Sequence, residues 1–311
     1  MRIAVTGSTG TLGSQVVDLL ARDAATPEGG TEGGPLEVLA LARRPAAVLG
    51  ALSPAASASG VVVPVFADYD DVGSLRSALR GVDVLVFVSG DGEAARMLVQ
   101  HENVVRAAAA GGVGHVVYLS GVDADLASPF CYAFTNGYTE RLLVGSGCGF
   151  SFARASLFTQ FVAAFLRPAL VSGELRVPAG GGRVALVSRS DVGRCLAALA
   201  LLPPSGRHHD LTGPAAFTFE GLAGVLTGIG GAAVRYTEVA PGVHVEELAR
   251  AGEDPWWTYA YSTMFASVRE DRWSTVSGEV LRLTGRAPLS VADVMGSGSG
   301  DSGIRRDVTD A

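Results

Sequence analysis

Short apolar runs alternate with longer amphipathic segments along the first half of the chain. The apolar runs lie at residues 3–5, 36–42, 61–66, 82–88, 115–119 and 150–154. Continuous apolar runs are typical of parallel strands that are covered on both faces, and apolar positions three or four residues apart are typical of helices. Six such strand and helix units in succession predict an α/β fold with a doubly wound parallel sheet of the Rossmann type.

Beyond residue 155 the alternation is less regular and predicts a smaller α/β C-terminal lobe. The pattern predicts helices over 157–166, 191–202, 218–226, 243–250 and 256–268, and extended segments over 173–187, 209–212 and 233–239. We therefore expect a first domain over residues 1–155 and a second lobe over 156–295 that can interleave with it. The Pro- and Gly-rich stretch 24–35 predicts an inserted surface loop, and Gly-Ser repeats predict a disordered tail over 296–311.

The turn that follows the first strand carries glycine at every third position: Gly7, Gly10 and Gly13. In such a turn the first glycine permits the tight bend, the second lets backbone N–H groups approach a phosphate, and the third lets the helix pack close to the strand. Because a strand precedes this turn and a helix follows it, the pattern predicts a site for a dinucleotide pyrophosphate. The alternative is a turn that binds nothing, in a chain with 41 glycines.

Two arginines, Arg43 and Arg44, end the second predicted strand. At this place in a Rossmann-type unit an acidic residue binds the ribose hydroxyls of NAD, whereas an arginine can bind the 2′-phosphate of NADP. The pair therefore favours NADP, as NADPH, over NAD. The alternative is two solvated arginines on a surface turn.

The overall charge of the chain argues against two classes of partner. A formal net charge of −7 and a pI near 5.3 oppose attraction to nucleic acid or to anionic membranes. The chain shows no signal sequence and no apolar run long enough to span a bilayer, so we expect a cytoplasmic protein that binds neither. Cys131, Cys148 and Cys195 lack CxxC spacing, which favours reduced core residues over disulfides or metal ligands.

All 24 basic residues are arginine, and the sequence contains no lysine. Every mechanism that requires a lysine amine is therefore excluded, including Schiff-base chemistry and the lysine that many short-chain reductases place beside a catalytic tyrosine. This exclusion holds even if the arginine excess reflects only codon usage.

Six segments together carry a family resemblance: VTGSTGTLG at 5–13, ALARRP at 40–45, ADYDD at 67–71, QHENVVRAAAAGGVGHVVYLSG at 100–121, TERLLVGSG at 139–147 and GRAPLSVADV at 285–294. Through their order and spacing the chain resembles the atypical short-chain dehydrogenase/reductase superfamily over nearly its whole length. Within that superfamily it is similar to the NmrA-like group, which includes bacterial NAD(P)H:quinone oxidoreductases.

The resemblance implies a set of site residues. The pyrophosphate loop falls on Gly7, Thr9, Gly10, Thr11, Leu12 and Gly13, and the 2′-phosphate contact on Arg43 with Arg44 beside it. The adenine contact falls on Asp68 and Tyr69, and the turn after the fourth strand on Ser89 and Gly90. The superfamily's Ser, Tyr and Lys catalytic positions map onto Ser120, Tyr132 and Asn136.

The third of these positions departs from the superfamily pattern, because Asn136 stands where a lysine is usual. That lysine binds the nicotinamide ribose and lowers the pKa of the tyrosine through its charge. An amide can keep the hydrogen bond but not the charge, so alcohol oxidation through a tyrosinate is disfavoured. Reduction of a quinone or another electron-poor conjugated acceptor remains feasible, with a hydrogen bond from Ser120 or Tyr132. The alternative is that Ser120 only ends a strand and Tyr132 only packs.

Three functions are consistent with these residues. The first is an NADPH-dependent reductase of a quinone-like or enone-like small molecule, with the second lobe binding the substrate. The second is a redox-sensing regulator that binds NADP without turnover, and the third is a tailoring enzyme of secondary metabolism in the same superfamily. Trp256 and Trp257 are either a lid over a flat substrate or packing residues, and residues 101–110 are, by resemblance alone, a candidate homodimer surface. No metal site is expected.

Overall fold

A seven-stranded sheet forms the centre of the fold in the computed structural model, which describes residues 1–24, 36–90 and 92–296. The strands are β1 (Arg2–Val5), β2 (Glu37–Ala42), β3 (Val62–Phe66), β4 (Val84–Phe87), β5 (His115–Gly121), β6 (Gly149–Ala155) and β9 (His208–Leu211). Their order is β3-β2-β1-β4-β5-β6-β9, with β1 at the point where the strand order reverses. The predicted doubly wound α/β fold is confirmed.

The strand β9 joins this sheet although the sequence pattern assigned residues 209–212 to the second lobe. The amide of Phe152 donates to the carbonyl of Arg207, and the amide of Ser156 donates to the carbonyl of Leu211. Both donors and both acceptors advance in the same direction along the chain, so β9 lies parallel to β6. The sheet therefore has one strand more than the six predicted units supply.

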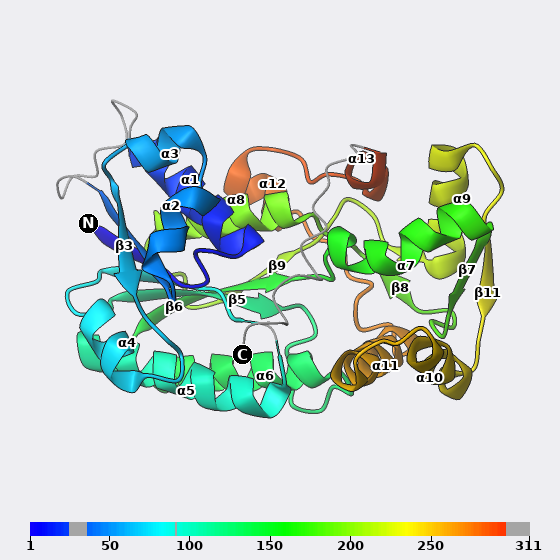
Figure 1. Ribbon diagram of the computed structural model, residues 1–311, viewed down its shortest axis with the longest axis horizontal. Coiled ribbons are helices and arrows are strands. Elements are labelled where there is room, and N and C mark those ends of the chain that lie inside the picture. The colour runs from blue at the N-terminus through cyan, green and yellow to red at the C-terminus, as the bar shows by residue number, and fades with distance from the viewer. Residues whose placement is uncertain (25–35, 91, 297–311) are drawn as a thin grey trace. The chain divides into compact units, whose positions relative to one another are not determined.

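Helices cover both faces of the sheet. Figure 1 shows α1 (Thr11–Ala24) and α8 (Arg189–Ala200) on one face, and α4 (Val72–Ala78), α5 (Ala94–Gly111) and α6 (Cys131–Val144) on the other. The core beneath the second group is continuous, and Leu75, Phe87, Val104, Tyr118 and Leu143 are all almost fully buried in it. Three short helices, η1 (Pro45–Ala47), α2 (Val48–Ala51) and α3 (Pro54–Ala58), follow β2 and were not predicted.

The remaining elements all follow β6 in the chain. They are the helices α7 (Thr159–Ser172), α9 (Phe219–Gly230), α10 (Pro241–Arg250), α11 (Pro255–Arg269), α12 (Glu279–Thr284) and α13 (Val291–Gly296), and the strands β7 (Glu174–Val177), β8 (Arg183–Val184), β10 (Phe217–Thr218) and β11 (Arg235–Glu238). β7 pairs parallel with β11, and β8 pairs antiparallel with β10. The short helices α12 and α13 were not predicted from the sequence.

The chain forms two compact units. The first comprises residues 1–120, 135–154 and 192–209, and the second comprises residues 121–134, 155–191 and the described residues from 210 onward. The predicted loop at 24–35 and the predicted tail at 296–311 lie outside the described residues except at their first positions, where the prediction was wrong: Ala24 ends α1 and Gly296 ends α13. No helix in the described part of the chain is long and apolar enough to cross a membrane.

Candidate functional site

The glycine turn after β1 is held by its neighbours in sequence. The hydroxyl of Thr6 donates to the carbonyl of Val88 over 2.9 Å, and the hydroxyl of Ser8 donates to the carbonyl of Leu41 over 2.9 Å. These two bonds fasten the turn to the carboxyl ends of β4 and β2. Gly7 adopts a φ of 62°, in the left-handed region where a side chain is strained. The turn therefore has one defined shape.

The start of α1 is packed against this turn as the third glycine was predicted to allow. A Cβ on Gly13 would lie 2.1 Å from the carbonyl oxygen of Gly7, a distance that no side chain tolerates. A Cβ on Gly10 would lie 3.3 Å from the same oxygen. The first amides of a helix lack partners within the helix, so the N-terminal residues Thr11 and Leu12 present N–H donors and partial positive charge at this turn. The arrangement suits an anion.

Arg43 and Arg44 follow β2 directly and are both exposed. No carboxylate in the described part of the chain lies within ion-pair distance of the Arg43 guanidinium. Its charge acts on the phenol of Tyr69 and the carboxylate of Asp70, which places the three side chains in one neighbourhood. Arg43 is therefore in a position to bind an additional anion.

Tyr69, one of the two residues expected to contact adenine, is fixed by polar bonds at both ends. Its hydroxyl donates to the carbonyl of Val88 over 2.5 Å, and Asn103 donates to its backbone carbonyl over 3.0 Å. Burial raises the pKa of the Tyr69 phenol well above its usual range, so the group stays protonated. A Cβ on Gly90 would contact the Tyr69 ring at 3.9 Å, so these two predicted residues lie together.

Asp68 stands beside Tyr69 and shapes the turn after β3. One carboxylate oxygen of Asp68 accepts a hydrogen bond from the backbone amide of Asp70 over 3.0 Å. The backbone amide of Asp68 donates to the hydroxyl of Ser74 over 3.0 Å. The carboxylate therefore has a local structural role whether or not it contacts a ligand.

Ser120, at the end of β5, donates its hydroxyl to the carboxylate of Glu140 over 2.6 Å. Arg154 binds the same carboxylate through two nitrogens, at 2.8 and 2.5 Å. Glu140 is only 7% exposed and Arg154 is partly buried, so a buried carboxylate has both of its oxygens engaged in this ion pair. Because the Ser120 proton is directed at Glu140, the Ser120 oxygen presents lone pairs rather than a donor to other groups. Neither Glu140 nor Arg154 was predicted as a site residue.

Asn136 lies on α6 beside a phenol that the sequence analysis did not identify. The Tyr118 hydroxyl donates to the side-chain oxygen of Asn136 over 2.8 Å. Thr139 and Ser89 also act on this phenol, which places Ser89 near the hydroxyl that Asn136 binds. Two predicted site residues therefore meet at Tyr118, which belongs to the apolar strand β5.

Tyr132 belongs to the second unit, whereas Ser120 and Asn136 belong to the first. Its hydroxyl accepts a hydrogen bond from the indole nitrogen of Trp256 over 3.3 Å. The rings form a series of edge contacts from Trp273 through Phe130 and Tyr132 to Trp256, with centroids 5.5 to 6.2 Å apart. Tyr259 stands next to Trp256 at 5.5 Å and is 52% exposed. We refer to these five rings as the aromatic series.

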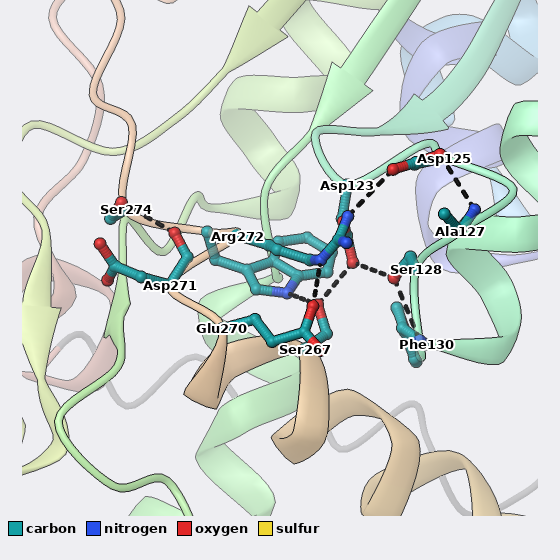
Figure 2. Close-up of polar contacts among 11 residues, drawn as sticks. Asp123, Asp125, Ala127, Ser128, Phe130, Ser267, Glu270, Asp271, Arg272 and Ser274 are labelled. Carbon is teal, nitrogen blue, oxygen red and sulfur yellow. Dashed lines mark hydrogen bonds and ion pairs between the residues drawn. The ribbon is translucent and has the colours of Figure 1, made fainter.

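A buried carboxylate holds the segment that carries Tyr132. Figure 2 shows Asp123 facing Ser128, Ser267 and Arg272. The Arg272 guanidinium lies 3.3 Å from the Asp123 carboxylate, and the indole of Trp273 donates to Ser267 over 2.7 Å. Burial raises the pKa of Asp123, although these donors oppose the shift. The segment between β5 and α6 is thereby fastened to the end of α11.

Two buried histidines of the first unit make acid conditions unfavourable to the fold. His101 bonds the hydroxyl of Thr139 through Nδ1 over 2.8 Å, and His115 bonds Ser151 through Nε2 over 2.9 Å. Burial lowers the pKa of each imidazole to about 4. Both rings are therefore neutral at physiological pH and serve packing rather than proton transfer.

We expect the free energy of unfolding to fall between about pH 6.5 and pH 4, because the unfolded chain binds protons there that His101 and His115 do not. For His101 alone the full loss is roughly 3 kcal/mol, from its pKa of about 4 against 6.5. Urea unfolding of His101→Gln across this range should show a shallower decline than the natural protein. The matched change at the exposed His208 should leave the decline unaltered, and equal slopes for all three proteins would contradict the assignment.

All three cysteines are buried, as expected of core residues. Within the described ranges no group of three or more His, Cys, Asp or Glu side chains is arranged to hold a metal ion.

Comparison with known proteins places the chain in a family. The model of the NmrA-like family matches residues 1–249, and the chain belongs to that family, which confirms the resemblance. Quinone oxidoreductase 2 of Escherichia coli is 31% identical over 251 residues, which cover 80% of this chain and 82% of that protein. The NAD(P)H azoreductase of Xenophilus azovorans is 26% identical over 293 residues, which cover 94% and 96%.

Solved structures agree with this assignment. The structure of the NADPH-dependent quinone oxidoreductase QOR2 from Escherichia coli, complexed with NADPH, matches with a TM-score of 0.83 and 28% identity over 95% of this chain and 99% of that one. The triphenylmethane reductase of Citrobacter sp., complexed with NADP(H), matches with a TM-score of 0.81 and 26% identity over 95% and 99%.

Proposed function

We propose that the protein is an NADPH-dependent oxidoreductase that reduces a quinone-like or otherwise conjugated small molecule. The single observation that carries the proposal is the turn between β1 and α1, which leaves no room for a side chain at Gly13. Three of its relatives are named a quinone oxidoreductase, an azoreductase and a triphenylmethane reductase, and quinones, azo compounds and triphenylmethane dyes are electron-poor conjugated acceptors. Family membership and this turn together support a nucleotide-dependent reductase.

The residues of the turn fit the phosphates of NADPH. The packing of Gly13 brings the first amides of α1 up to the turn, where N–H donors and the helix dipole favour a pyrophosphate. Arg43 at the end of β2 is placed to bind the 2′-phosphate, and Tyr69 and Gly90 border the same edge of the sheet. NADPH supplies the hydride when it is bound.

The side chains near the end of β5 favour an acceptor that stabilises its own negative charge. Ser120 directs its proton to Glu140, and the chain has no lysine to acidify a phenol. A quinone or conjugated acceptor delocalises the charge that develops on its oxygen or nitrogen, so it requires less help from the protein. Tyr132 remains the proposed hydrogen-bond donor to the acceptor, and the aromatic series offers flat apolar rings on the second unit.

The decisive experiment measures the loss of NADPH absorbance with a panel of quinones, azo dyes and enones. Turnover with at least one acceptor supports the proposal. Tight nucleotide binding in calorimetry with no oxidation by any acceptor would instead favour the redox-sensing regulator. Tyr132→Phe tests the donor role, because turnover that is unchanged in this variant would remove Tyr132 from the reaction.

Replacement of Arg43 by alanine should weaken NADPH binding roughly tenfold to hundredfold, the value of one charge-assisted hydrogen bond to the 2′-phosphate. NADH binding should hardly change, because NADH lacks that phosphate. Calorimetric titration of both nucleotides measures the two effects, and Arg76→Ala, at an exposed position on α4, is the matched control. An equal loss for NADPH and NADH would contradict the role of Arg43.

A further inference from the structure

We infer that Tyr118 is a positioning residue that fixes the side-chain amide of Asn136 with its NH2 group turned toward the nucleotide. The inference rests on the proposed function, because it concerns how the same NADPH is held. The chain thereby supplies an oriented neutral donor on α6, in a protein that has no lysine to supply a charged one.

The hydrogen bond between the two residues runs from the phenol of Tyr118 to the side-chain oxygen of Asn136. Tyr118 is completely buried in β5, and burial raises the pKa of its phenol far above its usual range, with the nearby Glu140 charge adding to the effect. The phenol therefore keeps its proton, and it donates to the Asn136 oxygen over 2.8 Å. A deprotonated phenol would instead accept a hydrogen bond from the NH2 group, and the Asn136 amide would then be turned the other way round.

The amide geometry then determines what Asn136 offers. The oxygen and the NH2 group of an amide leave its planar carbon in different directions, so an oxygen directed at Tyr118 turns the NH2 group away from it. Asn136 is only half-buried, whereas Tyr118 is inaccessible. The two N–H donors of Asn136 are therefore the part of this pair that a ligand can reach.

The location of the pair points to the nucleotide as that ligand. Ser89 also acts on the Tyr118 phenol, and it lies just beyond the carboxyl end of β4. The strand β4 pairs directly with β1, which leads into the glycine turn. Ligands of doubly wound sheets lie along the carboxyl ends of the strands around the point where the strand order reverses. A dinucleotide whose pyrophosphate rests on the glycine turn extends along this edge.

The Tyr118 ring also packs against Phe87, His101 and Phe152, with centroids 5.2 to 6.5 Å apart. A change that removed the ring would disturb these contacts and confuse packing with positioning. Tyr118→Phe removes only the hydroxyl and leaves the ring in place. Tyr138→Phe is the matched control, because it also removes a tyrosine hydroxyl, in this case from α6. Within the described residues the Tyr138 hydroxyl has no hydrogen-bond partner.

Calorimetric titration of Tyr118→Phe should show NADPH and NADH both binding roughly threefold to tenfold more weakly, because the amide loses its fixed orientation and both nucleotides lose the same contact. Thermal denaturation measures any change in folding separately. In the Asn136→Ala background the same Tyr118→Phe change should have no further effect on binding, since the amide through which Tyr118 acts is gone.

Two results would overturn the inference and leave Tyr118 a packing residue. One is that the losses of nucleotide affinity caused by Tyr118→Phe and Asn136→Ala add in the double variant. The other is that Tyr118→Phe binds the nucleotides as tightly as the natural protein. The readout is binding, so a failure to reduce any acceptor would count against the proposed function and leave this comparison intact. A natural protein that binds neither nucleotide would overturn both.

Discussion

Alanine in place of Gly13 is expected to abolish NADPH binding and to lower the melting temperature sharply. The added Cβ would lie 2.1 Å from the oxygen and 2.5 Å from the carbon of the Gly7 carbonyl, both backbone atoms that cannot rotate away. The helix α1 would have to move off the turn, which would separate its first amides from the proposed phosphate site. The cost should exceed about 3 kcal/mol, because overpacking against fixed backbone is at the upper end of such penalties.

The matched control is the same substitution at Gly224, which is exposed on α9 with no atom within 4 Å of the added carbon. That change should stabilise the protein by about 0.5 to 1 kcal/mol, because alanine favours a helix over glycine. Thermal denaturation and NADPH titration measure both variants. A Gly13→Ala protein that melts and binds like the natural one would show that the close packing of α1 is not essential.

Replacement of Arg154 by methionine should destabilise the fold by about 3 to 5 kcal/mol, because it leaves the buried Glu140 carboxylate without its cation. Both Glu140 oxygens now accept from Arg154, and only the Ser120 hydroxyl would remain among these bonds. Urea unfolding at neutral pH measures the loss. Methionine keeps much of the apolar length of arginine, so the comparison isolates the charge.

A second substitution distinguishes charge from packing at this pair. Adding Glu140→Gln to Arg154→Met removes the buried charge, so the double variant should recover part of the lost stability. A double variant that is no more stable than Arg154→Met would indicate that the loss comes from packing. Turnover measured on the double variant would also show whether the Ser120 hydroxyl affects the reaction once it no longer donates to a carboxylate.

The elements proposed to position the nucleotide could be predicted because their signals are local. A strand, three glycines at fixed spacing and an amphipathic helix specify the β1 turn, and Arg43 follows the next strand directly. The structure adds the reasons why the turn is rigid, namely the bonds of Thr6 and Ser8 to neighbouring strands. Those bonds join residues far apart in the sequence, so no local pattern predicts them.

The features that the sequence did not predict all depend on distant partners. The strand β9 pairs with β6 across more than fifty residues, and strand pairing leaves no trace in the periodicity of either strand. Glu140 looks like a solvated helix residue until Arg154 is placed beside it, and Tyr118 looks like one more apolar residue of β5. A buried polar group is recognisable only through the group that satisfies it.

The way the chain divides between its two units limits how such a protein can be cut or recombined. Because the chain changes units after residues 120, 134, 154, 191 and 209, no single break separates one unit from the other. A fragment that ends at residue 155 would lack β9 and α8, exposing one edge of the sheet and part of one face. Grafting the second unit from a relative would therefore require three segments to be exchanged at once.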